Sequence, residues 1–395
     1  MARRNGGFIG TDGLDAPDPP TGVAASGILT SLSVSFTAPT DAGTSAITGF
    51  RAQASGVGTS GTSSPLVITG LTEATEVSVS VWAINAYGYS APSAPILATP
   101  AAGRGIFAGG ENASGTLLNV IEFITVSSTG NATDFGDLVT PTRRSAAFSS
   151  STRGVIAGGR GSGVHNVIQY ITIASAGDSL DFGDLVAAKE HVAGFSNSTR
   201  GVIGGGGTSE TNVIQFVTID TTGNATDFGD LSAARKNGGG LASTTRGVFC
   251  GGNEDAGDVD TMEYVTIASA GNATDFGNLS SARGFIMEGC TSNNTRGIIC
   301  GGDSSGLVDI IEYITIANTG NATDFGDLSS VRQGTAAITS GNRSVIGGGQ
   351  GANTSDARNI MEFVDISSTG NVTDFGDLSN NQTELCGVSN SHGGL

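Results

Sequence analysis

The stretch Asp134–Leu138 reads DFGDL, and the chain of 395 residues carries it six times. One copy differs by a single residue, with Asn278 in place of the second aspartate. Successive copies are 46 to 50 residues apart, and self-similarity at such a period indicates one repeated supersecondary unit. A residue that recurs in every copy is therefore expected to serve the scaffold. The six phenylalanines, which we expect to pack between neighbouring units, are Phe135, Phe182, Phe228, Phe276, Phe325 and Phe375.

Each repeat contains four candidate strands. In the first copy, Arg104–Gly110 ends in Gly-Gly, and Asn119–Val126 is apolar on both faces. DFGDL follows, and Ser145–Ser150 is a run of small residues behind an arginine. A strand that is buried on both faces has such a continuous apolar run. The repeats therefore predict stacked β-sheets.

This pattern resembles the Kelch β-propeller family, in which a hydrophobic strand ends in Gly-Gly and a later strand carries an aromatic residue. The phenylalanine of DFGDL stands where that family has tryptophan. The resemblance implies six blades between residues 104 and 395. The final strand, Thr383–Ser389, would complete the blade that begins at Arg104–Gly110, and this closure leaves no free sheet edge. The aromatic positions are Phe123, Tyr170, Phe216, Tyr264, Tyr313 and Phe363.

Residues 19–100 have a different sequence pattern from the repeats. Leu32, Val34 and Phe36 alternate with polar residues, and turn residues interrupt the segment about every ten residues, as in a small β-sandwich. The segment resembles a fibronectin type III domain, with Phe36 where that family has tryptophan and Val77 where it has tyrosine. The stretches that carry the resemblance are Pro19–Ser26, Leu32–Pro39, Ile47–Ser55 and Gly70–Ser93.

Composition excludes several classes of protein. The formal net charge is −18, which argues against binding nucleic acid or an anionic membrane by simple electrostatics. No apolar run approaches the roughly 20 residues of a transmembrane helix, so membrane insertion is not expected. Residues 1–18 lack the apolar core of a signal peptide. The four cysteines form no disulfide or zinc pattern, and Cys250 and Cys300 occupy a small-residue position before Gly-Gly.

Several motifs have both a chemical and a structural interpretation. DFG resembles the metal-binding triplet of kinases, but six copies favour packing; calcium binding by Asp134 and Asp137 is the alternative. The Asn-Ala-Thr triplets, such as that at Asn131, match a glycosylation acceptor, although hairpin geometry explains them without a glycan. Glu288 and Glu384 are expected on inner strands, where they either face a wet channel or form a catalytic acid pair.

The loops are expected to divide between two faces of the ring. The turns between first and second strands and the turns before DFGDL are alike from copy to copy, whereas the loops after Gly-Gly differ. Function usually lies on the variable loops of a rigid scaffold. The candidate ligand-binding residues are Asn112, Ser114, Arg160, His165, Glu210, Glu254, Asp255, Asp303, Gln350, Asn353 and Asp356.

The near-identical repeats, the non-secretory N-terminus and the spacer-like domain resemble virion proteins of tailed bacteriophages, notably tail, fibre or accessory proteins. The resemblance implies an N-terminal arm (residues 1–18), a domain (19–100), a linker (101–103) and a propeller (104–395). The arm would bind other virion proteins through Arg3, Arg4 and Phe8, the alternative being a frayed terminus. The propeller would contact a glycan or protein of the host surface, which places the chain on the phage particle.

Two other functional classes stay open at this point. One is an extracellular or cell-surface bacterial adhesin or carbohydrate-binding protein. The other is a glycan-active enzyme on a Kelch scaffold, which would need a convergent acid pair or a metal in the central channel. Only His191 of the three histidines is expected on an inner strand. We therefore expect a non-enzymatic protein without a cofactor.

Overall fold

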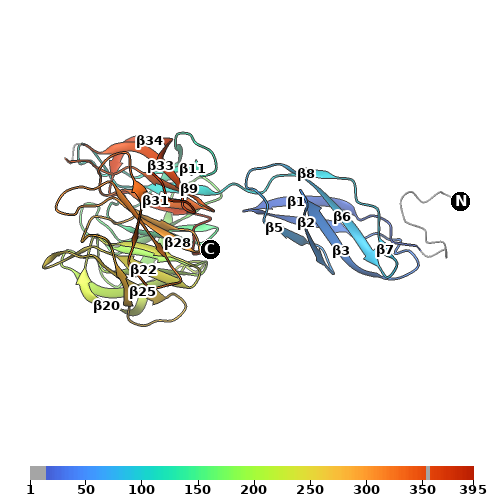
Figure 1. Cartoon of the computed structure of the whole chain (residues 1–395), viewed down its shortest axis with the longest axis horizontal. Coiled ribbons are helices and arrows are strands. Elements are labelled where there is room, and N and C mark those ends of the chain that lie inside the picture. Colours follow the sequence, from blue (N-terminus) through green and yellow to red (C-terminus); the bar gives the residue numbers. More distant parts are fainter. Residues whose placement is uncertain (1–14, 353–355) are drawn as a thin grey trace. The chain divides into compact units, whose positions relative to one another are not determined.

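The computed structural model describes residues 15–352 and 356–395 (Figure 1). Within these ranges the chain is all-β, with strands β1 to β35 and no helix, as the sequence predicts. The chain divides into two compact units between Ala102 and Gly103. The candidate anchor residues Arg3, Arg4 and Phe8 and the candidate loop residue Asn353 lie outside the described residues.

The first unit contains two antiparallel sheets around one core. Leu32 and Val34 from one sheet and Val79 and Val81 from the other are completely buried. Phe36 packs on Phe50 with ring centroids 4.8 Å apart. One sheet has the order β1 (Thr21–Ile28), β2 (Ser31–Thr37) and β5 (Leu66–Thr69). The other has the order β4 (Val57–Gly61), β3 (Ile47–Ala54), β6 (Val77–Asn85) and β7 (Gly88–Tyr89), and β8 (Ile96–Ala98) also pairs with β6.

The second unit contains six large sheets, in each of which four antiparallel strands follow one another from the inner to the outer position. The first two are β35 (Cys386–Ser389), β9 (Arg104–Ala108), β11 (Val120–Thr125), β12 (Thr133–Asp137), and β13 (Ala146–Ser149), β14 (Arg153–Ala157), β15 (Val167–Thr172), β16 (Leu180–Asp184). The next two are β17 (Ala193–Ser196), β18 (Arg200–Gly204), β19 (Thr211–Thr218), β20 (Thr226–Arg235), and β21 (Gly239–Ala242), β22 (Arg246–Cys250), β25 (Thr261–Thr266), β26 (Thr274–Asn278). The last two are β27 (Cys290–Ser292), β28 (Arg296–Cys300), β29 (Ile310–Thr315), β30 (Thr323–Asp327), and β31 (Ala336–Ser340), β32 (Arg343–Gly347), β33 (Arg358–Asp365), β34 (Thr373–Thr383). Short β10 (Glu111–Asn112) pairs with β34 and adds a fifth strand to the last of these sheets, and β23 (Asn253–Glu254) and β24 (Gly257–Asp258) form a separate two-stranded sheet.

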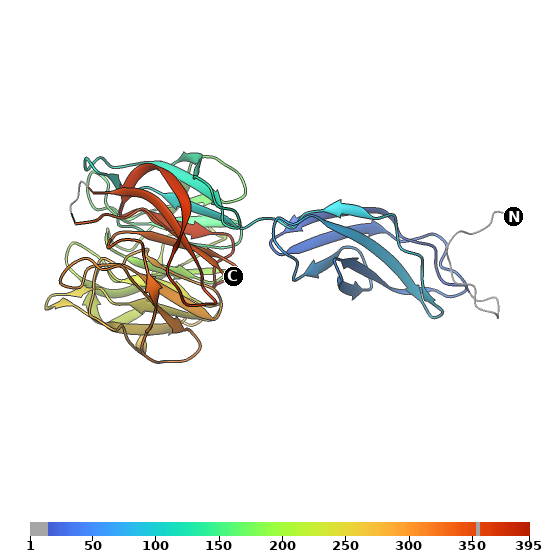
Figure 2. The same cartoon turned by 45° about the horizontal axis from the view of Figure 1, so that its top comes forward.

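The end of the chain completes the first sheet of this unit. β35 pairs antiparallel with β9, in the register Cys386 opposite Ala108. Figures 1 and 2 show the late strands of the chain, in orange and red, beside β9 and β11 in cyan. The inner strands contact one another in the order β35, β13, β17, β21, β27 and β31, and β31 again contacts β35. Six hydrophobic clusters each draw residues from two neighbouring sheets, so that every sheet shares a core with both of its neighbours.

The DFGDL repeat forms the joint between neighbouring sheets. Phe135 is 2% exposed and meets Phe123 of its own sheet edge to face, with ring centroids 6.2 Å apart. Gly136 has φ 151°, and a Cβ there would lie 2.5 Å from the carbonyl oxygen of Gly177 in the next sheet, so no side chain fits. The Asp137 amide donates to Asp178 Oδ1 across the same joint (2.9 Å). In the other joints an asparagine takes the place of Asp178: Asn131, Asn224, Asn272, Asn321 and Asn371.

The inner strands begin later than the sequence indicates. β35 starts at Cys386 rather than Thr383, because β34 continues to Thr383 and Glu384 then adopts a left-handed conformation with φ 56°. His191 and Glu288 also precede their strands, β17 and β27. The expectation that His191, Glu288 and Glu384 lie on inner strands is therefore wrong by a few residues, and each belongs to the loop that enters the strand.

Candidate functional site

Six loop residues surround one end of the inner strands, each in the segment that leads into one of them. All six have left-handed backbones, with φ between 51° and 63°. Five of them are not glycine; a non-glycine residue in this region costs about 1–3 kcal/mol and persists only where its surroundings hold it there. We call this set the mouth ring: Arg144, His191, Asn237, Phe285, Gly334 and Glu384.

Main-chain hydrogen bonds close the mouth ring. The Arg144 amide donates to the carbonyl of Glu384 (3.1 Å), and the Glu384 amide donates to Gly334 (2.8 Å). The His191 amide donates to Arg144 (2.8 Å). The circle continues through Asn237 to His191 (3.1 Å), Ile286 to Asn237 (3.2 Å) and Gly334 to Phe285 (3.3 Å). The six positions therefore share a backbone conformation and a circle of main-chain hydrogen bonds, while each holds a different residue.

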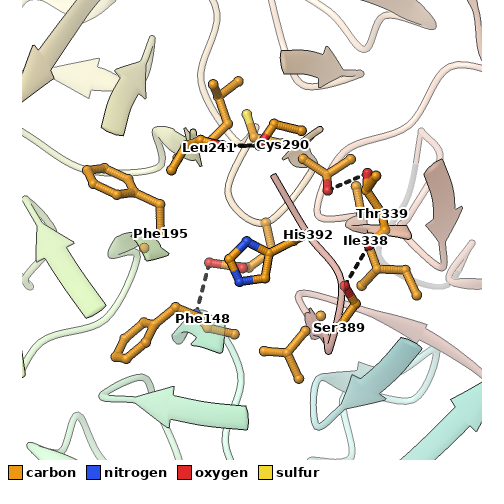
Figure 3. A pocket seen from close by; sticks show the side chains of 18 of the residues that line it. Phe148, Phe195, Leu241, Cys290, Ile338, Thr339, Ser389 and His392 are labelled. Carbon is orange, nitrogen blue, oxygen red and sulfur yellow. Dashed lines mark hydrogen bonds between the residues drawn. The ribbon is translucent and has the colours of Figure 1, made fainter. Parts of the chain in front are cut away.

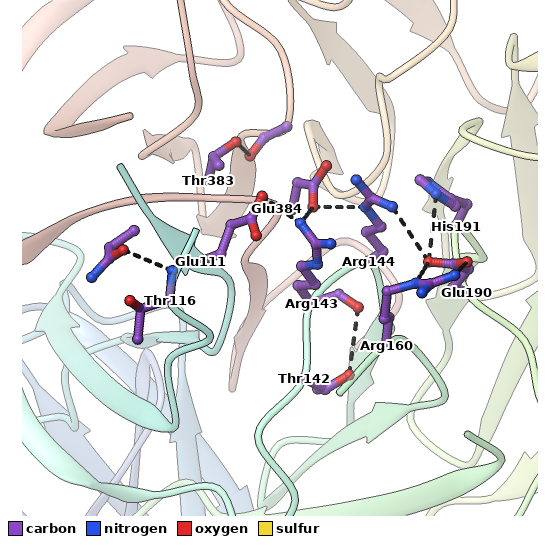
Figure 4. A network of polar contacts seen from close by, with 12 residues as sticks. Glu111, Thr116, Thr142, Arg143, Arg144, Arg160, Glu190, His191, Thr383 and Glu384 are labelled. Atoms are coloured by element: carbon purple, nitrogen blue, oxygen red, sulfur yellow. Dashed lines mark hydrogen bonds and ion pairs between the residues drawn. The ribbon is translucent and has the colours of Figure 1, made fainter. Parts of the chain in front are cut away.

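A network of charged side chains extends from one side of the mouth ring (Figure 4). Arg144 bridges two carboxylates: its Nε lies 2.7 Å from Glu384 Oε2, and its Nη1 lies 3.4 Å from Glu190 Oε2. Arg160 forms a fork with Glu190, at 2.7 and 2.6 Å. Arg143 Nη1 contacts Glu384 Oε2 at 3.1 Å and also pairs with Glu111. The network thus contains three arginines and three glutamates.

Burial and pairing set the protonation of this network. Burial raises the pKa of Glu190, but the Arg160 hydrogen bonds and the nearby guanidinium charges outweigh burial, and the pKa lies below its ordinary value. Burial lowers the pKa of Arg144, and Glu384 and Glu190 raise it further than that, so Arg144 stays charged. Burial lowers the pKa of His191 to about 4, with Arg144 acting in the same direction. At neutral pH Glu190 is therefore ionised, Arg144 is charged and the imidazole of His191 is neutral.

The inner strands line a small chamber (Figure 3). Its volume is about 50 Å³, and its wall combines hydroxyls with apolar groups. His392 lies across it, with Nε2 2.9 Å from the carbonyl oxygen of Ser149. The Gly393 amide donates to Ser292 (2.8 Å) on the far side. Residues 392 and 393 therefore cross one end of the chamber.

Glu288 reaches the same chamber. Its side chain belongs to the loop before β27, yet its Oε1 accepts from the amide of Ala147 on β13, three sheets away around the ring (3.3 Å). Burial raises the pKa of Glu288 well above its ordinary value, and the Ala147 amide only partly opposes this. The carboxyl group is therefore a neutral cross-brace. Glu288 and Glu384 differ in environment, since Glu384 is paired with two arginines.

Of the sequence candidates, the structure places Arg160 within the charged network. His165 is beside it, with Nε2 3.1 Å from Thr142 Oγ1, and burial lowers its pKa. Asn112 instead caps a turn, where its Oδ1 accepts from the amides of Ser114 and Thr116.

The remaining candidates are spread over the other loops after Gly-Gly. Glu210 pairs with Lys236 at 2.7 Å, and Asp356 pairs with Arg358 at 3.0 Å. Asp303 Oδ1 accepts from the Gly306 amide within its own turn (2.7 Å). Glu254 lies in the hairpin of β23 and β24, Asp255 lies in the turn between these strands, and Gln350 is bridged to Gln333. The structure does not gather these side chains into one site.

Sequence reasoning missed Glu111, Arg143, Arg144 and Glu190 as site residues. The signal is in the chain all the same. Arg143 and Glu190 each occupy the fifth position after the leucine of DFGDL in their repeat, and Arg144 occupies the sixth. At both of these positions the six repeats have six different residues. Non-repeating residues in a repeating frame are where function is to be sought.

Within residues 15–352 and 356–395, no group of three or more histidine, cysteine or acidic side chains is arranged to hold a metal ion. The same ranges contain no helix that could span a bilayer. All four cysteines, Cys250, Cys290, Cys300 and Cys386, are buried thiols. Neither the protein-family models nor the curated proteins compared with this chain match it.

Proposed function

We propose that the second unit is a six-bladed β-propeller of the Kelch type and that the first is a fibronectin type III-like sandwich. Support for the propeller comes from the six four-stranded sheets, the cores shared between neighbours and the pairing of β35 with β9. Closure by the two ends of one chain removes free sheet edges. Support for the sandwich comes from two sheets that share one core.

We further propose that the chain is a non-enzymatic binding protein that displays the mouth of the propeller to a surface. One observation carries this proposal. The scaffold positions repeat six times, whereas the repeat position shared by Arg144 and Glu384 holds a different residue in every copy. Its carboxylates are already engaged by guanidinium groups, which suits recognition better than acid–base chemistry.

As for its biological setting, we propose a structural or accessory protein of a tailed-phage virion. The arm (residues 1–18) would attach to other virion proteins, and the propeller would contact a glycan or protein of the host surface. This part of the proposal depends on the resemblance of the sequence to such proteins. In the alternative proposal, a bacterial surface adhesin, the same binding face would be displayed on a bacterial cell surface and not on a phage particle.

The location of the chain tests this proposal. Phage particles are purified by density gradient from the culture that produces the protein. An antibody against residues 103–395 is then applied in immunogold electron microscopy. Discrete labelling of assembled particles is expected, together with the chain in their peptide mass spectra. Labelling of bacterial envelopes with none on particles would replace the virion role by the adhesin role.

A further inference from the structure

The charged network presents its two signs unequally to solvent. The side chains of Glu190 and Glu384 are 4% and 7% exposed. Those of Arg144 and Arg160 are 22% and 34% exposed. The carboxylates therefore lie underneath and hold the guanidinium groups in place, and the accessible atoms are mostly N–H donors.

The guanidinium groups keep unused donors. Within the described residues, Arg160 bonds through Nε and Nη2 and leaves Nη1, while Arg144 bonds through Nε and Nη1 and leaves Nη2. A guanidinium fixed by one carboxylate can offer its remaining edge to a second in-plane acceptor. The two arginines also approach the same carboxylate, Glu190, so their guanidinium groups are close neighbours (Figure 4).

A buried imidazole lies directly beside these arginines. His191 is only 9% exposed, and the side chain of Asn237 lies next to its ring. The imidazole stacks edge to face on Phe285 of the mouth ring, with ring centroids 6.3 Å apart. Phe285 is half-buried and supplies an apolar surface opposite the arginines. Donors on one side and an aromatic ring on the other suit a ligand that has both a polar group and C–H faces, such as a sugar.

We propose that Arg144 and Arg160 bind the carboxylate of an acidic sugar at the mouth ring. This inference rests on the proposed display function and gives it a ligand class. A carboxylate matches the planar fork of a guanidinium, which a point charge such as lysine does not reproduce. The chain as a whole carries −18 charges, so a densely charged polyanion would be repelled. A single carboxylate on an otherwise neutral sugar avoids most of that repulsion and still engages both arginines.

The experiment uses the full chain in isothermal titration calorimetry. The probes are uronic-acid oligosaccharides, the same oligosaccharides after reduction of the carboxyl to a primary alcohol, and the corresponding sugar phosphates. Binding of the uronates is expected, with a loss of at least tenfold in affinity on carboxyl reduction. Equal binding of the reduced sugars would overturn the proposal. Tighter binding of the sugar phosphates would overturn the choice of carboxylate over phosphate.

The variants R160Q and R160K test the assigned residue. R160K keeps a positive charge beside Glu190 and removes the fork, so it guards against loss of folding in R160Q. Both are expected to weaken uronate binding at least tenfold while thermal melting of R160K stays within a few degrees of the parent. The matched control is R358Q, which alters an arginine that is 27% exposed and paired with Asp356 on a different loop after Gly-Gly. Unchanged affinity in R160K contradicts the proposal.

The failure of this inference is distinguishable from failure of the display function. If the chain labels virions and binds no uronate, the display function stands and the carboxylate site falls. If the chain binds uronates through Arg160 and is absent from virions, the site stands and the virion role falls.

Discussion

Arg283 donates from Nη2 to Oε2 of Glu312, and both side chains are buried, with exposures of 0% and 1%. The same pair joins neighbouring sheets at two other places, as Arg235 with Glu263 and Arg332 with Glu362. At the other three places the equivalent positions hold no arginine. The residues there are Lys189 with Gln215, Thr142 with Gln169, and Gln382 with Glu122. A buried guanidinium therefore stands only where a carboxylate can neutralise it.

Removal of one partner of such a buried pair leaves an uncompensated charge, which typically costs about 3–5 kcal/mol. We expect R283M to lower the free energy of unfolding by about that amount. E312Q introduced into R283M should recover much of the loss, because Gln169 occupies the same position without a cation opposite. Calorimetric melting of the three variants checks this. Recovery is the decisive result, and a double variant as unstable as R283M would contradict it.

The glycine of DFGDL provides an internally controlled test of the joint. A Cβ on Gly229 would lie 2.4 Å from the carbonyl oxygen of Gly271 in the next sheet, whereas a Cβ on Gly271 meets nothing within 4 Å. Overpacking of this kind typically costs about 1–3 kcal/mol. We expect G229A to lower the melting temperature clearly and G271A to leave it nearly unchanged. Equal effects of the two changes would show that the contact does not restrict this position.

The asparagines of the Asn-Ala-Thr triplets join neighbouring sheets. Asn272 Oδ1 accepts from the Asp230 amide at 3.1 Å, and Asp178 makes the equivalent bond in its own joint. We expect N272A to cost about 1 kcal/mol, the usual net value of one hydrogen bond, and N272D to be nearly neutral. Urea unfolding measures both. A large loss in N272D would mean that the amide group, and not only its oxygen, is required.

The repeated columns could be predicted from the sequence because each is buried in the same way six times. Phe135 and its counterparts had to be packing residues, and the structure buries all of them. Glu384 shows where local patterning fails. Nothing in the run Thr383–Ser389 marks the left-handed turn that separates β34 from β35, because the turn is held by main-chain bonds to Arg144 and Gly334, which are remote in sequence.

The site was predictable only in part, for a related reason. Arg160 stood out because it lies in a loop that varies among copies. Glu384, Arg143 and Glu190 come from three loops. Glu384 reaches Arg143 only because the last sheet and the first lie side by side, whereas Glu190 reaches Arg144 because the loops that enter β13 and β17 are neighbours. The spacing of residues along the chain does not reveal which loops meet when the last sheet lies beside the first. Buried pairs such as Arg283 and Glu312 could be found from the sequence, however, by comparing equivalent positions of the repeats.

Completion of the first sheet by β35 predicts a strong effect of truncation. Removal of residues 382–395 takes away one of the two partners of β9, exposes its inner edge and removes the core contacts of Val388. We expect the second unit to melt at least ten degrees lower, or to aggregate, while the first unit keeps its own transition. Removal of residues 390–395 alone is the matched control and should have a smaller effect, because β35 is retained. An unchanged melting midpoint after the longer truncation contradicts closure by this strand.

Glu288 predicts an unusual dependence of stability on pH. Its pKa in the folded state is raised by burial, so the folded protein binds this proton more tightly than the unfolded chain does. The stability that comes from the neutral carboxyl is therefore fully present below the unfolded pKa of about 4.3 and is lost as the pH rises toward the folded pKa. Over that window the loss approaches about 1.4 kcal/mol per pH unit for a single proton.

The variant E288Q keeps an oxygen acceptor for the Ala147 amide and cannot ionise. We expect E288Q to match the parent near pH 4 and to become progressively more stable than the parent above it, as followed by urea unfolding at a series of pH values. The difference between the two proteins isolates Glu288, because the paired carboxylates such as Glu190 titrate alike in both. The control D134N changes an exposed rim carboxylate and should show no such divergence. If the E288Q and parent curves stay parallel from pH 4 to 9, Glu288 is not the neutral cross-brace that its position between β27 and β13 indicates.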